Sequence, residues 1–137
     1  MRVMLDINVV LDIVGGRKPF YEASKAAFLK VVELGEAPFL AVHAYPTIYY
    51  LLGSAATRSQ RDGAMEWVFD SFSAAAIGPS EIAAARGFGM TDFEDALVAS
   101  AAVSAGCECI VTRNVADFAA SPVKAVSPAD FIASYAD

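Results

Sequence analysis

Polar residues with side chains that bind cations recur at three separated places in this 137-residue sequence. Those that follow a short apolar run or open a helix-like segment are Asp6, Asn8, Asp92, Asp95, Thr112, Asn114 and Asp117. Asp92 and Asp95 are three residues apart, so they would share one face of a helix. Carboxylates that gather within a few ångströms repel one another, and a cation or shifted protonation is needed to keep them together.

A hard divalent ion would satisfy such a cluster. Mg²⁺ and Mn²⁺ prefer carboxylate oxygen and water as ligands. Zinc is disfavoured because the chain has only two cysteines, Cys107 and Cys109, and one histidine, His43. The sequence therefore predicts a site for Mg²⁺ or Mn²⁺.

The elements that must position these residues alternate between strand-like and helix-like segments. Strands are expected at residues 2–5, 39–42, 74–77, 109–111 and 123–126, and helices at 8–14, 19–34, 47–52, 58–69, 79–87, 92–105 and from 128 onward. We expect Thr57 to cap one helix, and Thr91 to cap another in a capping box with Glu94. This alternation of strands and helices predicts a three-layer α/β/α sandwich with a mostly parallel sheet, in one domain over residues 1–137. Sites in such sheets form beyond the carboxyl ends of the strands.

Composition and charge narrow the class of protein. With 56% hydrophobic and 19% charged residues, the chain can bury a substantial core. No apolar run is long enough to span a bilayer, so we expect a cytoplasmic protein, with Cys107 and Cys109 buried, reduced and on one face of a strand. The net charge of −6 argues against holding nucleic acid by bulk electrostatics. A nucleic-acid substrate would need a bound cation, local arginines or a basic partner.

Three segments resemble the signature segments of PIN domains in order and spacing. They are LDINVVLD at residues 5–12, DFEDAL at 92–97 and VTRNVADF at 111–118. The resemblance covers nearly the whole chain. It implies a metal-dependent endoribonuclease, often the toxin of a bacterial toxin–antitoxin pair of the VapC type, with RNA as substrate and an antitoxin protein as partner.

The resemblance also assigns roles to single residues. Asp6 matches the first family acid and Asp95 the acid of the later helix, Asn8 matches the residue that orients the first acid, and Thr112 the one that closes the site. Two positions depart from the pattern: Thr47 stands where many relatives have glutamate, and Asn114 where the motif usually has aspartate. The metal ligands are then expected to be Asp6, Asp95 and Asp117, with Asn8, Asp92, Thr112 and Asn114 in support.

Other interpretations compete at several of these positions. Asp6 alone would often be a helix cap, and Glu94 in a first helical turn is expected to be structural. We expect Asp12 to be a solvated helix residue and His43 to be structural. Tyr45, Tyr49, Tyr50 and Trp67 could stack on bases, but their helical spacing favours core or dimer packing. Arg17, Lys18 and Arg113 are the expected phosphate contacts.

Three functions follow. The leading one is an Mg²⁺- or Mn²⁺-dependent endoribonuclease that forms a homodimer and binds an antitoxin. The second is a PIN-fold module that binds RNA or protein without cleavage, favoured by Thr47 and Asn114. The third is a phosphoacceptor signalling domain, which ranks last because it needs a lysine near the end of the last strand and Lys124 lies at its start.

Overall fold

The protein is built around one five-stranded sheet, described by a computed structural model over residues 1–135. The strands are β1 (Val3–Leu5), β2 (Phe39–Ala41), β3 (Ser73–Ala75), β4 (Cys109–Val111) and β5 (Lys124–Val126). Their order across the sheet is β3-β2-β1-β4-β5, and every pair is parallel. The predicted α/β class with a mostly parallel sheet is confirmed. The last two residues of the expected domain lie outside the described residues.

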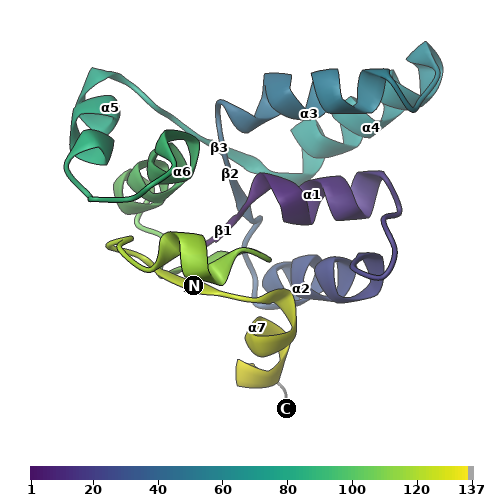
Figure 1. The fold of residues 1–137 in the computed structure, drawn as a ribbon. Coiled ribbons are helices and arrows are strands. Elements are labelled where there is room, and N and C mark those ends of the chain that lie inside the picture. The colour runs from purple at the N-terminus through teal and green to yellow at the C-terminus, as the bar shows by residue number, and fades with distance from the viewer. Residues whose placement is uncertain (136–137) are drawn as a thin grey trace.

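Helices cover both faces of this sheet. They are α1 (Ile7–Val14), α2 (Tyr21–Glu33), α3 (Ala44–Gly53), α4 (Arg58–Ser71), α5 (Pro79–Arg86), α6 (Phe93–Ser104), the 3₁₀ helix η1 (Val115–Phe118) and α7 (Pro128–Ser134). Figure 1 shows α5 and α6 on one side of the sheet and α1, α3 and α4 on the other. The arrangement is the predicted three-layer sandwich.

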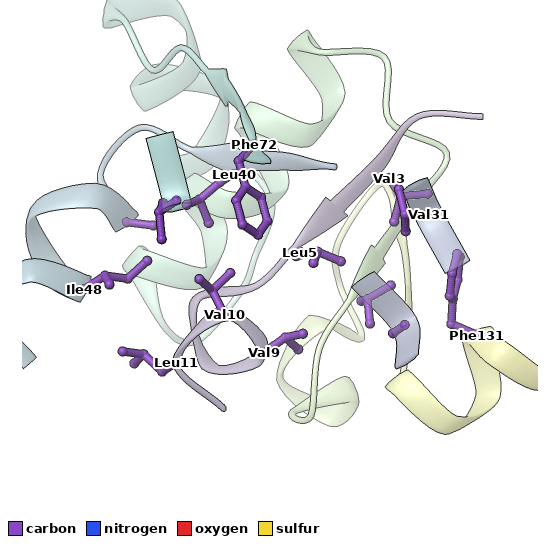
Figure 2. Close-up of a cluster of buried hydrophobic side chains, with 14 of the residues drawn as sticks. Val3, Leu5, Val9, Val10, Leu11, Val31, Leu40, Ile48, Phe72 and Phe131 are labelled. Carbon is purple, nitrogen blue, oxygen red and sulfur yellow. The ribbon is translucent and has the colours of Figure 1, made fainter. Parts of the chain in front are cut away.

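Alternate strand residues point into two separate apolar clusters. Val3 and Leu5 of β1 belong to the larger cluster with side chains of α1, α2, α3, α4 and α7, drawn in Figure 2. Met4 of β1 and Ile110 of β4 belong to the second cluster, under α6. Strands buried on both faces need apolar residues at every position, which explains the uninterrupted runs in β1 and β4.

Side chains define the start of several helices. The Thr57 hydroxyl accepts a hydrogen bond from the Gln60 amide at 3.2 Å, and the Thr57 amide donates one to the Gln60 side-chain Oε1 at 2.9 Å. The predicted Thr57 cap is therefore confirmed. The predicted cap of α6 is wrong by one residue, because Asp92 and not Thr91 caps this helix and its Oδ1 accepts from the Asp95 amide at 3.0 Å.

The two cysteines are buried and free, as expected. Their predicted common face is wrong, because Cys107 lies in the irregular connection before β4, where the two-residue period of a strand does not apply. Cys109 packs in the larger cluster and Cys107 in the second one. Burial raises the pKa of Cys107 to about 12 and that of Cys109 to about 11, so both remain protonated at neutral pH.

Within residues 1–135, no helix is long and apolar enough to cross a membrane.

Candidate metal centre

The strand order places a natural site beside β1. The chain adds β2 and β3 on one side of β1, then β4 and β5 on the other, so the direction of winding reverses between β1 and β4. Open α/β sheets bind ligands at this switch point, beyond the carboxyl ends of the strands. Leu5 and Val111 are partners in the register of β1 and β4. The next residues, Asp6 and Thr112, therefore meet at the site.

Asp6 is held in one orientation by hydrogen bonds from both segments. The side chain is 2% exposed; its Oδ1 accepts from the Ile7 amide at 2.9 Å and its Oδ2 from the Thr112 hydroxyl at 2.8 Å. Thr112 Oγ1 in turn accepts from the Asn114 amide at 3.0 Å. Burial raises the pKa of Asp6, the hydrogen bonds from Thr112 and Ile7 oppose the shift, and the charge of Glu94 adds to it. Asp6 is thus both the cap of α1 and a buried acid at the switch point.

Asp95 is the point on which the acidic residues converge. It lies in the first turn of α6 and is partly buried. Burial is the largest cause that raises its pKa, followed by the charges of Asp6, Asp92, Asp117 and Glu94 in that order, and together they bring the pKa to about 7. Carboxylates from the end of β1, the start of α6 and η1 therefore lie near enough to Asp95 for their charges to raise its pKa.

Asp117 is exposed in the first turn of η1, and Asn114 precedes that turn. The Asp117 amide donates to the Asn114 carbonyl at 3.0 Å. Asp117 is near enough to Asp95 for its charge to raise the Asp95 pKa.

The chemistry of these donors fits a hard divalent ion. Oxygen is the only ligand atom that Asp6, Asp95 and Asp117 offer, and Mg²⁺ and Mn²⁺ prefer such atoms. Part of the rise in the Asp95 pKa, after the larger effect of burial, comes from the neighbouring carboxylates, and a cation would relieve this repulsion. In the described part of the chain, no three acidic, histidine or cysteine side chains already lie close enough together to hold an ion. The donors fit in kind but do not form a closed cage.

His43 belongs to this neighbourhood, which the sequence interpretation missed. It directly precedes α3 and is partly buried. Burial lowers its pKa, while the charges of Glu94 and Asp6 oppose the shift, which places the imidazole near both carboxylates. Its Nδ1 is buried and makes no hydrogen bond within residues 1–135. The position of His43 just beyond β2, at the same sheet edge as Asp6, was the signal that could have found it.

Thr47 lies one turn further along α3. Its hydroxyl donates to the His43 carbonyl at 3.1 Å, so it satisfies the helix backbone. The substitution of threonine for the expected glutamate therefore leaves no anionic ligand on α3.

Asp12 is fully buried, so the expectation that it would be a solvated helix residue is wrong. Its Oδ2 accepts from Arg113 Nε at 2.8 Å and from the Ser24 hydroxyl at 2.9 Å, and its Oδ1 accepts from an Arg113 Nη at 3.2 Å. The Arg113 guanidinium also lies 3.9 Å from the centre of the Phe20 ring. Arg113 is committed to these internal contacts, with 24% of its side chain exposed.

The other predicted site residues differ in their distance from Asp6. Asn8 lies in the first turn of α1, two residues after Asp6. Arg17 and Lys18 are exposed and follow the far end of α1, whose eight residues span about 12 Å. A contact from Arg17 or Lys18 to RNA would therefore involve a phosphate some distance from the acids.

The pKa of Asp95 leads to a prediction about the metal-free protein. A folded-state pKa of about 7 above the ordinary value of 3.8 means that this carboxyl favours folding when protonated, and that the benefit is lost as pH rises from about 4 to about 7. Asp95→Asn is therefore expected to raise the melting temperature in EDTA by about 2–4 °C at pH 8, and by less at pH 5. Asp70→Asn, which alters an exposed carboxylate of α4, is the control. An Asp95→Asn protein that melts with wild type at pH 8 would contradict this electrostatic account.

Fold and site together define a doubly wound α/β domain with an acidic cluster at its switch point. The chain belongs to the PIN domain family, whose model matches residues 2–116, as the motifs predicted. No curated protein matches it in sequence.

Several solved structures share the fold at low sequence identity. VapBC2 from Rickettsia felis, bound to a promoter DNA fragment, has a TM-score of 0.71 at 13% identity over 93% of this chain and 98% of that one. VapBC-1 from nontypeable Haemophilus influenzae has a TM-score of 0.72 at 16% identity, over 94% and 99%. A toxin–antitoxin complex from Klebsiella pneumoniae has a TM-score of 0.67 at 18% identity, over 93% and 98%. Such identities support the fold and nothing finer.

Proposed function

We propose that this chain is a divalent-metal-dependent endoribonuclease and the toxin of a toxin–antitoxin pair, acting in the cytoplasm as a single domain over residues 1–137. The observation that carries the proposal is that four other carboxylates lie near enough to Asp95 to raise its pKa, at the switch point of a PIN domain. The similar solved structures, which include toxin–antitoxin complexes, support the second half of the proposal.

In this mechanism Asp6, Asp95 and Asp117 would hold Mg²⁺ or Mn²⁺. When bound, the ion supplies a nucleophilic water at neutral pH and stabilises charge that develops on the phosphate. The protein contributes a fixed Asp6 carboxylate, oriented by the Ile7 amide and the Thr112 hydroxyl. Asp95 must release its proton to act as a ligand. Asp92 caps α6, and its Oδ1 accepts a hydrogen bond from the Asp95 amide.

RNA is the proposed substrate, and the charge pattern suits a substrate held at a few points. The chain carries a net charge of −6, so metal and local basic residues must attract the phosphates. Arg17 and Lys18 are exposed and remain the proposed phosphate contacts. The Arg113 guanidinium uses Nε and one Nη for Asp12, so its other Nη is available for such a contact.

The substrate class can be tested with oligonucleotides of one sequence, made as single-stranded RNA, as an RNA hairpin and as DNA. Incubated with the protein and Mg²⁺ or Mn²⁺, one of the RNA forms is expected to be cut internally. If DNA is cleaved equally well, the protein would still be a nuclease, but the proposed selectivity for RNA would be wrong.

A second candidate function is a PIN-fold module that binds RNA or protein without cleavage. It is favoured by Thr47, whose hydroxyl is bonded to the helix backbone, and by Asn114, which replaces an acid. This function predicts that RNA binds equally well with and without Mg²⁺ and that no cleavage product forms. Metal-dependent internal cleavage would exclude it.

The proposed homodimer has a candidate surface on α3 and α4. A groove of about 520 Å³ lies between these helices, and its lining consists of Tyr45, Pro46, Tyr49, Tyr50, Asp62, Met65, Glu66 and Phe69. Tyr50 is 76% exposed and Phe69 61% exposed, although both are large apolar side chains. Such surfaces commonly mark interfaces. A basic segment of the proposed antitoxin would instead suit the acidic site.

We expect the Tyr50→Ser/Phe69→Ser double variant to shift the dimer toward monomer by at least about tenfold in Kd, because two aromatic anchors are lost. Light scattering at micromolar concentration measures the change. Val103→Ser, at an exposed apolar residue of α6, is the matched control. A monomeric wild-type protein would remove the dimer from the proposal.

A further inference from the structure

Two cross-links join the same two segments of the chain. Asp6 and Asp12 lie at the cap and in the second turn of α1, and Thr112 and Arg113 are adjacent residues at the exit of β4. The Thr112 hydroxyl donates to Asp6 Oδ2 at 2.8 Å, and Arg113 Nε donates to Asp12 Oδ2 at 2.8 Å. The first link contains the proposed metal ligand, and the second lies one residue away along the β4 exit.

The second link is built with more contacts than a surface ion pair. Asp12 is fully buried, receives two nitrogen donors of the guanidinium and also receives the Ser24 hydroxyl. The opposite partner is confined as well, because the Arg113 guanidinium lies against the Phe20 ring. A two-pronged contact stacked on an aromatic ring restrains rotation and translation in a way that a point charge does not.

Stability alone is a weak reason for this arrangement. Removing two charges from water is costly, and well-packed apolar residues in place of a buried ion pair often leave a protein as stable or more stable. What the pair provides is geometry, since it fixes the backbone of the β4 exit against α1. The hydroxyl of Thr112, which also accepts the Asn114 amide, is carried by that backbone.

We propose that Asp12 and Arg113 are positioning residues, which hold the β4 exit so that Thr112 keeps the Asp6 carboxylate in its ligand orientation. The inference rests on the proposed function for its consequence, weaker metal binding and slower cleavage. Its structural part concerns the chain alone: without the pair, the Thr112–Asp6 hydrogen bond loosens while the fold persists.

The test uses the Asp12→Asn/Arg113→Met double variant, which removes both charges together and leaves no unpaired buried ion. Amide hydrogen exchange is followed at Asn114, which donates to Thr112 Oγ1, and at Val42, which donates to the Ala75 carbonyl on the other side of the sheet. We expect exchange at Asn114 to accelerate at least about tenfold and exchange at Val42 to stay within about twofold. Mn²⁺ affinity, measured by calorimetry, is expected to fall at least about tenfold.

Two further variants separate positioning from general destabilisation. Arg113→Lys keeps the charge but loses the two-pronged contact, so it is expected to recover only part of the Mn²⁺ affinity. Lys30→Met/Glu33→Gln removes another ion pair, from α2, and is expected to match wild type in both measurements.

Equal acceleration at Asn114 and Val42, or wild-type Mn²⁺ affinity in the Asp12→Asn/Arg113→Met protein, would overturn the inference in favour of a purely structural pair. Failure of the proposed function gives a different pattern. Selective exchange at Asn114 with weakened Mn²⁺ binding, but no RNA cleavage by wild type, supports the positioning role and rejects the endoribonuclease.

Discussion

The Asp6→Asn variant is expected to cleave RNA at least about a hundredfold more slowly than wild type, at equal Mg²⁺ and equal protein. Asp6 is the buried acid of the cluster, and its two oxygens are already oriented by Ile7 and Thr112. Asparagine has the same shape but lacks the charge that both binds the ion and stabilises the transition state. Loss of one preorganised electrostatic contact in a catalytic site typically costs about 10²–10³ in rate.

This substitution separates chemistry from folding. Burial raises the pKa of Asp6, so removal of the charge is not expected to lower the melting temperature in EDTA. Asp70→Asn is again the control for an exposed carboxylate on a helix. Cleavage by Asp6→Asn within a few fold of wild type would mean that the acid at the switch point is only a helix cap.

The second large effect concerns the two departures from the family pattern. Asn114→Asp is expected to tighten Mg²⁺ binding about tenfold, because one added anionic ligand that contributes about 1.4 kcal/mol has that effect. Thr47→Glu is expected to do the same. Its present hydroxyl only bonds back to the His43 carbonyl, so little is lost. Wild type should accordingly bind Mg²⁺ weakly and prefer Mn²⁺, which accepts nitrogen and amide ligands more readily.

Calorimetric titration of Mg²⁺ into wild type and the two variants measures these affinities. If neither Asn114→Asp nor Thr47→Glu binds Mg²⁺ more tightly, positions 47 and 114 lie outside the metal shell. The family motif would then be misplaced at both.

Local signals in the sequence account for most of the fold. Unbroken apolar runs mark β1 and β4 because both faces of a parallel strand are buried. Thr57 and Ser127 cap α4 and α7 because each hydroxyl reaches the backbone three residues on. The meeting of Asp6 with Thr112 also follows from sequence, once β1 and β4 are taken as neighbours, since both residues directly follow a strand.

The sequence could not show which of two suitable residues caps a helix, or which residues far apart in the chain come into contact. Thr91 and Asp92 are both good helix caps, and the contact of Asp92 with the Asp95 amide decides between them. Asp12 was expected in solvent because an aspartate one turn beyond Asn8 in a helix is more often solvated than a ligand. Its partner Arg113 is 101 residues away, and only the fold brings the two together. His43 was expected to be structural, although its position just beyond β2 indicated that it would lie at the same sheet edge as Asp6.

The most direct test is RNA cleavage by one protein preparation before EDTA treatment, after it, and after Mg²⁺ or Mn²⁺ is restored. We expect internal cleavage to stop in EDTA and to return when the ion is added in excess, because the carboxylates around Asp95 provide no nucleophile of their own. Cleavage that continues at full rate in EDTA would contradict the account, since the convergence of acids at the switch point would then have no part in the reaction.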